Sequence, residues 1–152
     1  MSGEPQLPNP IFGNDCGGIQ VLDPAGIPSP LVIRQGDAIQ LQTTWSMDGT
    51  LAPGVAGVGP SLGVQFTVTY FYEGFGAAPE GTVGVVGPKS TDTLTPTVAG
   101  ATYTFGPADL RLSTTPSAAG MTDGVYELVV VVDVQGFSIT AFNRGPIIRV
   151  IP

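Results

Sequence analysis

The side chains that most often carry catalysis are scarce in this sequence. It contains no histidine and one cysteine, Cys16, which lies between Asp15 and Gly17. General acid–base and nucleophilic catalysis at neutral pH normally use histidine or an activated cysteine. A Ser-His-Asp triad is therefore impossible, and we expect Cys16 to be a small apolar filler or an unreactive thiol.

Two glutamates, Glu73 and Glu80, form the remaining arrangement that could do chemistry. They flank a Gly- and Pro-containing segment, across which two carboxylates could face each other and hydrolyse a glycosidic bond. Nothing nearby in the sequence marks a sugar cleft, and charges at strand ends commonly serve solubility. We therefore expect a protein that is not an enzyme, and a carboxylate-based hydrolase is the weakest alternative.

Metal and phosphate sites find little support in the residue spacing. Calcium sites need several oxygen ligands close together, as in Asp-x-Asp-x-Asp-Gly, whereas this chain has only isolated Asp-Gly pairs at 48–49 and 123–124. Without histidine, the usual nitrogen ligand of zinc, copper or haem is missing. The Gly-x-Gly spacings lack the strand-to-helix context and the lysine of a phosphate loop. We expect no metal and no cofactor.

An aromatic cluster offers a second kind of function. Tyr70, Phe71, Tyr72 and Phe75 lie near the end of an alternating stretch and could stack on a sugar ring. Strand alternation turns Tyr70 and Tyr72 inward, which leaves Phe71 and Phe75 accessible. A carbohydrate- or small-ligand-binding β-sandwich is therefore the alternative function.

The elements that must position these residues are predicted to be strands. The chain has 22 glycines and 15 prolines, turn signals recur about every dozen residues, and no helical pattern is long enough to cross between parallel strands. Long stretches alternate with period two at 38–47, 64–73, 123–134 and 137–142. The sequence predicts an all-β fold, a single antiparallel β-sandwich of seven to nine strands over residues 17–152.

The stretch 123–134 is expected to be the central strand, since it is an almost unbroken run of β-branched residues. Its alternation and that of the other long stretches predict one core shared by two sheets. The expected core residues are Trp45, Phe66, Val68, Tyr70, Tyr126, Leu128, Val130 and Val132.

The Asp-Gly-Val-Tyr phrase at 123–126 resembles the immunoglobulin-like and fibronectin-type-III-like superfamily, whose penultimate strand often opens in this way. The Gln-Gly-Asp phrase at 35–37, before a strand that carries Trp45, also looks like the second strand of that family. The resemblance covers most of residues 18–151. It implies an immunoglobulin-like β-sandwich in which the Tyr126 hydroxyl returns to a backbone group upstream, and it implies no particular function.

Charge narrows the range of partners. Twelve acidic residues outnumber five basic ones, giving a net charge of −7, and no basic cluster interleaves with aromatics. Nucleic acids and anionic membranes would be repelled. No segment approaches the roughly 20 apolar residues of a membrane span, and the first ten residues lack the pattern of a signal peptide. We expect a cytoplasmic location by default, with export by a route that uses no classical signal left open.

Residues 1–16 are predicted to form an extended, Pro-rich arm, because Pro5, Pro8 and Pro10 exclude a helix. Such a segment cannot join a central sheet position but can lie along the edge of another subunit. We expect the arm to matter to association more than to the stability of the domain.

The side of the central strand that faces away from the core is expected to carry apolar residues. If its core residues point inward, Val129 and Val131 point outward. In the immunoglobulin-like arrangement that the chain resembles, its neighbours are the stretches 64–73 and 137–142, from which Phe71 and Phe142 also point outward. We interpret these four residues as a protein–protein interface, unless the loop 48–63 covers them. The sequence thus favours a structural or protein–protein interaction module, a subunit or accessory component of a larger assembly, bound to a protein partner or to further copies of itself.

Overall fold

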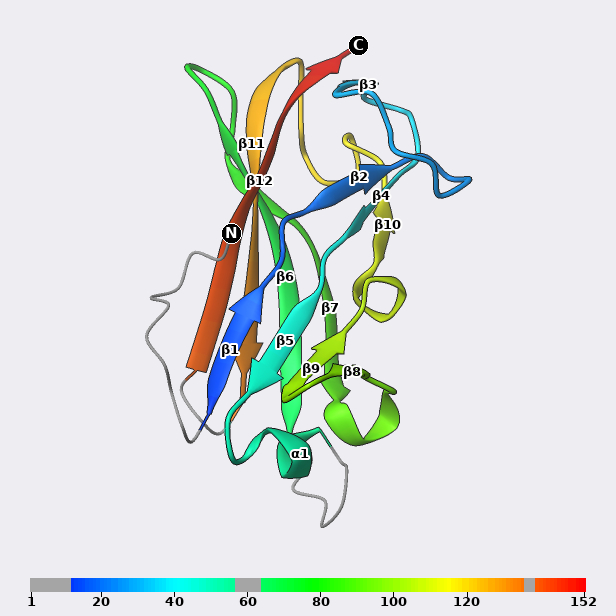
Figure 1. Cartoon of the computed structure of the whole chain (residues 1–152). Helices are drawn as coiled ribbons and strands as arrows, with labels where there is room; N and C mark the ends of the chain where they lie inside the picture. Colours follow the sequence, from blue (N-terminus) through cyan, green and yellow to red (C-terminus); the bar gives the residue numbers. More distant parts are fainter. Residues whose placement is uncertain (1–11, 57–63, 136–138) are drawn as a thin grey trace.

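The computed structural model describes residues 12–56, 64–135 and 139–152, and these form an all-β, sandwich-like fold (Figure 1). The described residues form twelve strands in three sheets, more than the seven to nine strands expected. The strands are β1 (Gly13–Cys16), β2 (Gln20–Leu22), β3 (Val32–Arg34), β4 (Ile39–Gln42), β5 (Trp45–Asp48), β6 (Gln65–Gly74), β7 (Gly81–Ser90), β8 (Thr97–Ala99), β9 (Thr102–Phe105), β10 (Leu112–Thr114), β11 (Gly124–Val134) and β12 (Ile139–Ile151). The short helical turns are α1 (Ala52–Val55), η1 (Thr91–Thr93) and η2 (Ala108–Leu110).

The five-stranded sheet is built around β11. Its order is β3-β12-β11-β6-β7, and all neighbours are antiparallel except β3 and β12, which run parallel. β11 pairs along nearly its whole length with β12 on one side and with β6 on the other. A run of β-branched residues suits a strand that packs on the core and is paired at both edges. The expectation that 123–134 forms the central strand is confirmed.

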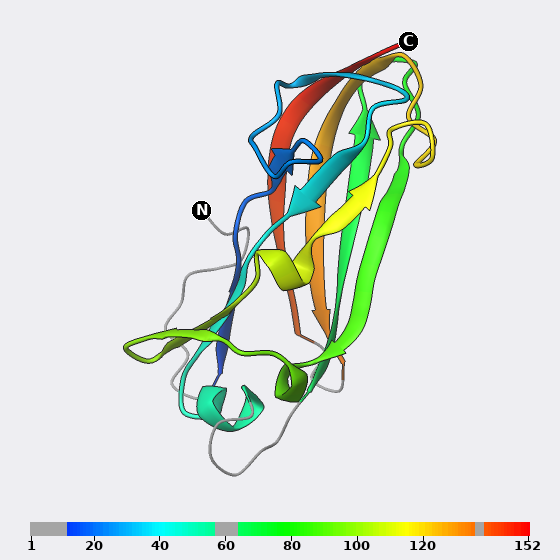
Figure 2. The ribbon, with the colours of Figure 1, turned by 90° about the vertical axis from the view of Figure 1, so that its right-hand side faces the viewer.

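The second layer is divided into two smaller sheets. One has the order β1-β5-β9-β8 and the other β10-β4-β2, so β4 and β5 lie in different sheets although they are consecutive in sequence. At the break, the Gly17 amide donates to the Thr44 carbonyl (2.8 Å) and the Thr43 hydroxyl donates to the Gly17 carbonyl (2.7 Å). The stretch 38–47 therefore forms two strands instead of one. Figure 2 shows β4 and β10 in front of the five-stranded sheet.

The two layers share one hydrophobic core around Trp45. The ring centroid of Trp45 lies 4.9 Å from that of Phe66 on β6 and 5.9 Å from that of Phe105 on β9. Aromatic contacts thus join the two layers directly. The inward register inferred for the long strands is confirmed, because all of the expected core residues are fully buried: Trp45, Phe66, Val68, Tyr70, Tyr126, Leu128, Val130 and Val132.

Buried tyrosines tie the strands to neighbouring segments. The Tyr126 hydroxyl donates to the Thr122 carbonyl (2.9 Å) and accepts a hydrogen bond from the Thr122 amide (3.0 Å). This is the upstream backbone contact expected for Tyr126. The Tyr70 hydroxyl on β6 donates to the Leu110 carbonyl (2.5 Å) at the end of η2, and this bond crosses from one layer to the other.

Two connections differ from the sequence expectation. The Gly-Pro-Lys-Ser sequence at 87–90 predicts a turn, but these residues are part of β7, where Gly87 adopts a φ of +104° and the pairing with β6 changes register. Glycine adopts such an angle without strain, so the chain continues as an irregular strand. The Thr-rich stretch 91–97 predicts a strand, but it begins as η1. The buried Thr91 hydroxyl donates to the Val55 carbonyl and holds the chain against α1.

The Asn-Arg-Gly-Pro sequence at 143–146 predicts an interruption of the last strand, but β12 continues through it. Its register against β11 shifts between Glu127 and Val129, so the Gly-Pro pair at 145–146 is accommodated as a β-bulge. A bulge or kink at this place is what the sequence indicates. The Gln-Gly pair at 135–136 predicts a tight two-residue hairpin turn, and this prediction lies partly outside the described residues.

The described chain begins and finishes at opposite ends of the sandwich. β1 starts near α1, and β12 ends at the far end, beside β3 (Figures 1 and 2). Gly13–Cys16, which the sequence assigned to the arm, pair with β5 as part of the sandwich, because Cys16 is buried in the core and Asn14 accepts a hydrogen bond from the Trp45 indole. Residues 1–11, the rest of the expected arm, lie outside the described residues.

Candidate functional site: the outer face of the five-stranded sheet

The side of β6, β11 and β12 that points away from the core carries a group of apolar side chains. Their sequence neighbours on β6 and β11 are buried, so alternation turns Phe71, Val129 and Val131 outward. Val129 pairs with Phe71, and Val131 pairs with Phe142 on β12. The structure thus brings together the four residues expected to form a contact surface, and we call these four residues the outer face.

The side chains of the outer face are partly exposed. Phe142 is 38% exposed, and the other three residues are half-buried. The alternative to a contact surface was that the loop 48–63 of the same chain covers these four residues. In its described part, α1 buries Ala52 and Val55 in the core at one end of the sandwich (Figure 1), and residues 57–63 lie outside the described residues.

Sequence reasoning missed apolar residues that extend this surface on both sides. Val85 on β7 is exposed and pairs with Thr69, which pairs in turn with Val131. Ile147 on β12 and Val32 on β3 are exposed on the opposite side. Simple alternation along the sequence does not predict that Ile147 and Val32 face outward, because β12 contains a bulge and the short β3 pairs with it in parallel.

Charged pairs lie beside the outer face. Glu73 on β6 and Glu127 on β11 are directly opposite each other, where like charges would repel. Arg144 relieves this repulsion: its Nη1 lies 2.5 Å from Glu127 Oε1 and 3.6 Å from Glu73 Oε2. Exposed pairs of this kind contribute about 1 kcal/mol or less. Their main effect is to place charged groups next to the apolar outer face.

An open pocket of about 440 Å³ adjoins the outer face between β6 and β7. Phe71 and Val129 supply apolar lining, so the pocket is continuous with the outer face. Polar lining comes from the end of β6 and from the start of β7, and it includes Glu73, Glu80, Gly81 and Thr82.

Gly74 shapes this pocket. A Cβ at Gly74 would lie 2.3 Å from the carbonyl oxygens of both Ala78 and Pro79, so the loop after β6 can fold back only because the residue is glycine. This close return brings Glu80 into the same pocket as Glu73.

The arrangement gives little support to the two ligand-based alternatives. Glu73 and Glu80 share a pocket, as a hydrolase would require, but both side chains are exposed and Glu73 contacts Arg144. A glycosidase needs one carboxyl kept protonated, commonly by apolar burial. For sugar stacking, Phe71 lines the pocket, whereas Phe75 is exposed on the following loop and does not line it.

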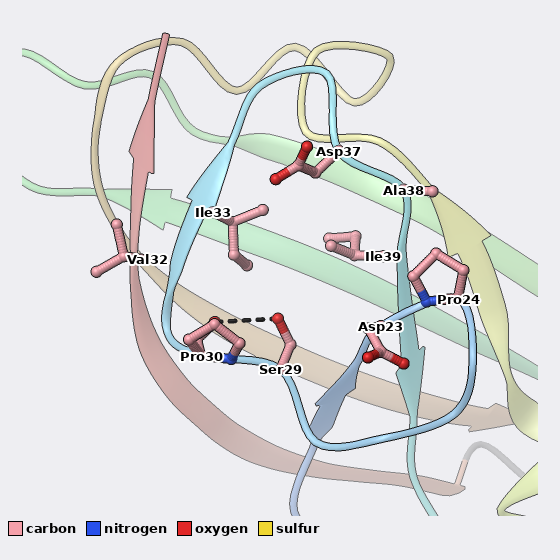
Figure 3. A pocket seen from close by; sticks show the side chains of 9 residues that line it. All are labelled: Asp23, Pro24, Ser29, Pro30, Val32, Ile33, Asp37, Ala38 and Ile39. Carbon is pink, nitrogen blue, oxygen red and sulfur yellow. Dashed lines mark hydrogen bonds between the residues drawn. The ribbon is translucent and has the colours of Figure 1, made fainter.

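A second pocket, of about 290 Å³, opens beside β3 and β4 (Figure 3). It is lined in part by Asp23 and Asp37. Asp23 Oδ1 accepts hydrogen bonds from the amides of Ala25 (2.9 Å) and Ile27 (3.0 Å), and Asp37 Oδ2 accepts one from the Arg34 amide (3.3 Å). Both carboxylates therefore stabilise their own turns, and the bond from the Ala25 amide to Asp23 is that of an Asx turn.

Cys16 is buried, as expected for a small apolar side chain, and its Sγ lies 3.8 Å from the Thr43 hydroxyl. Burial raises the pKa of the thiol from 9.0 to about 11, so it is protonated at neutral pH and a poor nucleophile. Within the described ranges, no three Asp, Glu or Cys side chains group as a metal site would require. No helix in the described part of the chain is long and apolar enough to cross a membrane.

Comparison with known proteins assigns no family. No family model matches the chain, and no curated protein matches it. Among solved structures, the chain is similar to the CooA pilin subunit from enterotoxigenic Escherichia coli, with 9% sequence identity and a TM-score of 0.41. The match covers 89% of this chain and 99% of that one. A likeness at this level identifies neither the fold family nor the function of the present chain.

Proposed function

We propose that this chain is a non-enzymatic structural or protein–protein interaction module, a subunit or accessory component of a larger assembly. The observation that carries the proposal is the outer face, where Phe71, Val129, Val131 and Phe142 are neighbours on three adjacent strands. A sheet face in water usually carries polar side chains. Contiguous apolar side chains in such a place commonly belong to a contact surface.

An immunoglobulin-like arrangement of the strands is part of the same proposal. The order β12-β11-β6-β7 corresponds to the sheet that carries the last two strands of a variable-type domain. The bond from the Tyr126 hydroxyl to the Thr122 carbonyl corresponds to the tyrosine corner of such domains. In this arrangement the outer face lies at the middle of the larger sheet, where a flat partner surface can reach it.

A carbohydrate- or small-ligand-binding sandwich is the second candidate. The pocket beside Phe71 supports it, since an aromatic ring and two carboxylates can stack on and hydrogen-bond to a sugar. The position of Phe75 outside the pocket lining removes the second stacking ring, so we rank this function below the first.

The test of the proposed function is Val131→Asp. A carboxylate at the centre of the outer face should abolish association, while the outward direction of the side chain leaves the fold intact. Val98→Asp is the matched control, because Val98 is 52% exposed on β8 in the other layer. Association is measured by size exclusion with light scattering, for the chain alone and for complexes isolated with it from its source cells.

A melting curve is recorded for each variant, to show whether a loss of association occurs in a folded protein. Loss of association in Val131→Asp, with the wild-type melting temperature and with Val98→Asp unaffected, supports the proposal. A Val131→Asp variant that unfolds, or that associates as the wild type does, overturns it. The expected cytoplasmic location belongs to the same proposal and is checked by cell fractionation.

A further inference from the structure

The pocket beside the outer face combines an apolar lining with an excess of negative charge. Phe71 and Val129 provide the apolar part, and Glu73 and Glu80 lie at the polar part. The pocket has a volume of about 440 Å³ and is continuous with the outer face, so a partner seated on that face would also reach the pocket.

The charge around the pocket is not balanced within the described residues. Arg144 is the cation beside it, bonded to Glu127 at 2.5 Å and to one oxygen of Glu73 at the longer distance of 3.6 Å. Glu80 is exposed and makes no hydrogen bond or ion pair with any other described residue. Arg144 therefore pairs with two of the three carboxylates of this region, and Glu80 adds a negative charge that no described cation balances.

A cationic side chain with an apolar stem matches this pocket. The stem can pack on Val129 and on the Phe71 ring, whose face also attracts a cation. The charged head can then bond to Glu80 and to the second oxygen of Glu73, and a guanidinium can do so through paired N–H groups. A neutral side chain could at most donate a hydrogen bond and would leave both negative charges unbalanced.

The chain itself is a poor source of that cation. Each copy carries a net charge of −7, so a second copy would bring repulsion over the long range. Two of its five basic residues, Arg144 and Arg149, are already paired with carboxylates of their own chain. Charge complementarity therefore favours a different, basic protein.

We propose that the pocket between Glu73 and Glu80 receives an arginine or lysine side chain of a basic protein partner that packs on the outer face. This inference rests on the proposed function and specifies the chemistry of its partner. The cation enters beside Phe71, and the apolar part of the partner covers Val129 and Val131.

The test is a titration of the ¹⁵N-labelled chain, followed by amide chemical shifts, with N-acetylarginine N-methylamide as the probe. The matched probe is N-acetylcitrulline N-methylamide, which has nearly the same shape and no charge. The arginine probe should move the amides of Gly81, Thr82 and Val129 in a saturable manner at millimolar concentrations, and added salt should weaken its binding. The citrulline probe should leave these amides in place.

Two variants decide whether the carboxylates are responsible. Glu80→Gln should weaken binding of the arginine probe about fivefold. Asp109→Asn, on the exposed η2 turn, changes the net charge by the same amount as Glu80→Gln does. This variant should bind the arginine probe as the wild type does. Equal binding of the two probes, equal affinity of the two variants, or no shift up to about 50 mM of the arginine probe would overturn the inference. Shifts of the same amides by cellobiose but not by arginine would overturn it in favour of a glycan.

The two proposals can fail separately. Val131 does not line the pocket, so Val131→Asp should still bind the arginine probe. Loss of association in Val131→Asp without any arginine binding rejects only the cationic partner. Arginine binding at the pocket, with association unchanged in Val131→Asp, rejects the outer face as the contact surface.

Discussion

Replacing Tyr70 by phenylalanine tests how strongly a single buried hydrogen bond holds the two layers together. The Tyr70 hydroxyl donates to the Leu110 carbonyl at 2.5 Å, and both residues are fully buried. Desolvation by burial raises the pKa of this hydroxyl, which agrees with an environment that water does not reach. Tyr70→Phe keeps the ring and removes only the oxygen, so the core loses its bond across the layers and almost none of its packing.

The expected loss of stability follows from what happens to the Leu110 carbonyl. A buried acceptor left without a partner costs about 1–3 kcal/mol, because no water replaces the lost donor. Tyr72→Phe is the matched control, since its hydroxyl donates at 2.9 Å to the carbonyl of Ala119, a half-exposed residue that water can reach. We expect about 2–3 kcal/mol for Tyr70→Phe and about 1 kcal/mol or less for Tyr72→Phe.

Urea unfolding of the three proteins measures the difference. The urea dependence of the free energy of unfolding should be the same for all of them, because the surface exposed on unfolding is nearly unchanged. The melting temperature of Tyr70→Phe should fall by about 5–10 °C, as expected for a chain of this size. If Tyr70→Phe destabilises the chain no more than Tyr72→Phe does, the Tyr70 hydroxyl is not isolated from water and the reasoning fails.

Three further changes probe the core, the cysteine and the backbone. Leu128→Ala should lower the free energy of unfolding by about 2–5 kcal/mol in urea titrations, through lost burial and the cavity left in β11; a loss below about 1 kcal/mol would contradict the assigned strand register. Because the pKa of the Cys16 thiol is raised by burial from 9.0 to about 11, the neutral thiol favours the folded state, and this contribution is complete below pH 9 and lost as the pH rises to 11. Wild type should therefore lose up to about 3 kcal/mol more than Cys16→Ala over that interval, and parallel pH profiles would show that the thiol is accessible. Gly106→Ala should cost at least about 2 kcal/mol, since its φ is +88° and a Cβ would lie 2.6 Å from the Thr43 carbonyl oxygen, whereas Gly18→Ala meets no atom within 4 Å; similar melting temperatures for the two variants would refute this account.

The side of the sheet that each side chain faces was predictable, because side chains alternate along a strand with a period of two. The alternation in β6 and β11 is uninterrupted, so the buried Tyr70 and Leu128 and the outward Phe71 and Val129 follow from the sequence alone. Their adjacency required one further assumption, that the two strands pair as in an immunoglobulin-like sheet. The observed pairing of Val129 with Phe71 agrees with that assumption.

The features that escaped prediction depend on contacts between distant parts of the chain. The break after Gln42 arises where the backbone of Gly17 bonds to Thr43 and Thr44, and no local pattern marks those residues as a break. The excess negative charge of the pocket depends on where Arg144 reaches after the bulge in β12 and on how closely the loop after Gly74 returns. Pairing register and loop return are set by the whole fold, so period-two patterns do not contain them.

The start of β1 and the end of β12 lie at opposite ends of the sandwich, and this placement affects how the described part of the chain would respond to force. β1 starts near α1, and β12 ends at the opposite end of the sandwich, so tension between the start of β1 and the end of β12 acts along both strands (Figure 1). The backbone bonds of β1 to β5 and of β12 to β11 are then loaded in shear and must fail together. A hairpin pulled from its open end would instead release its bonds one at a time. A subunit held by neighbours at these two points would carry a pulling load along its length and would resist peeling.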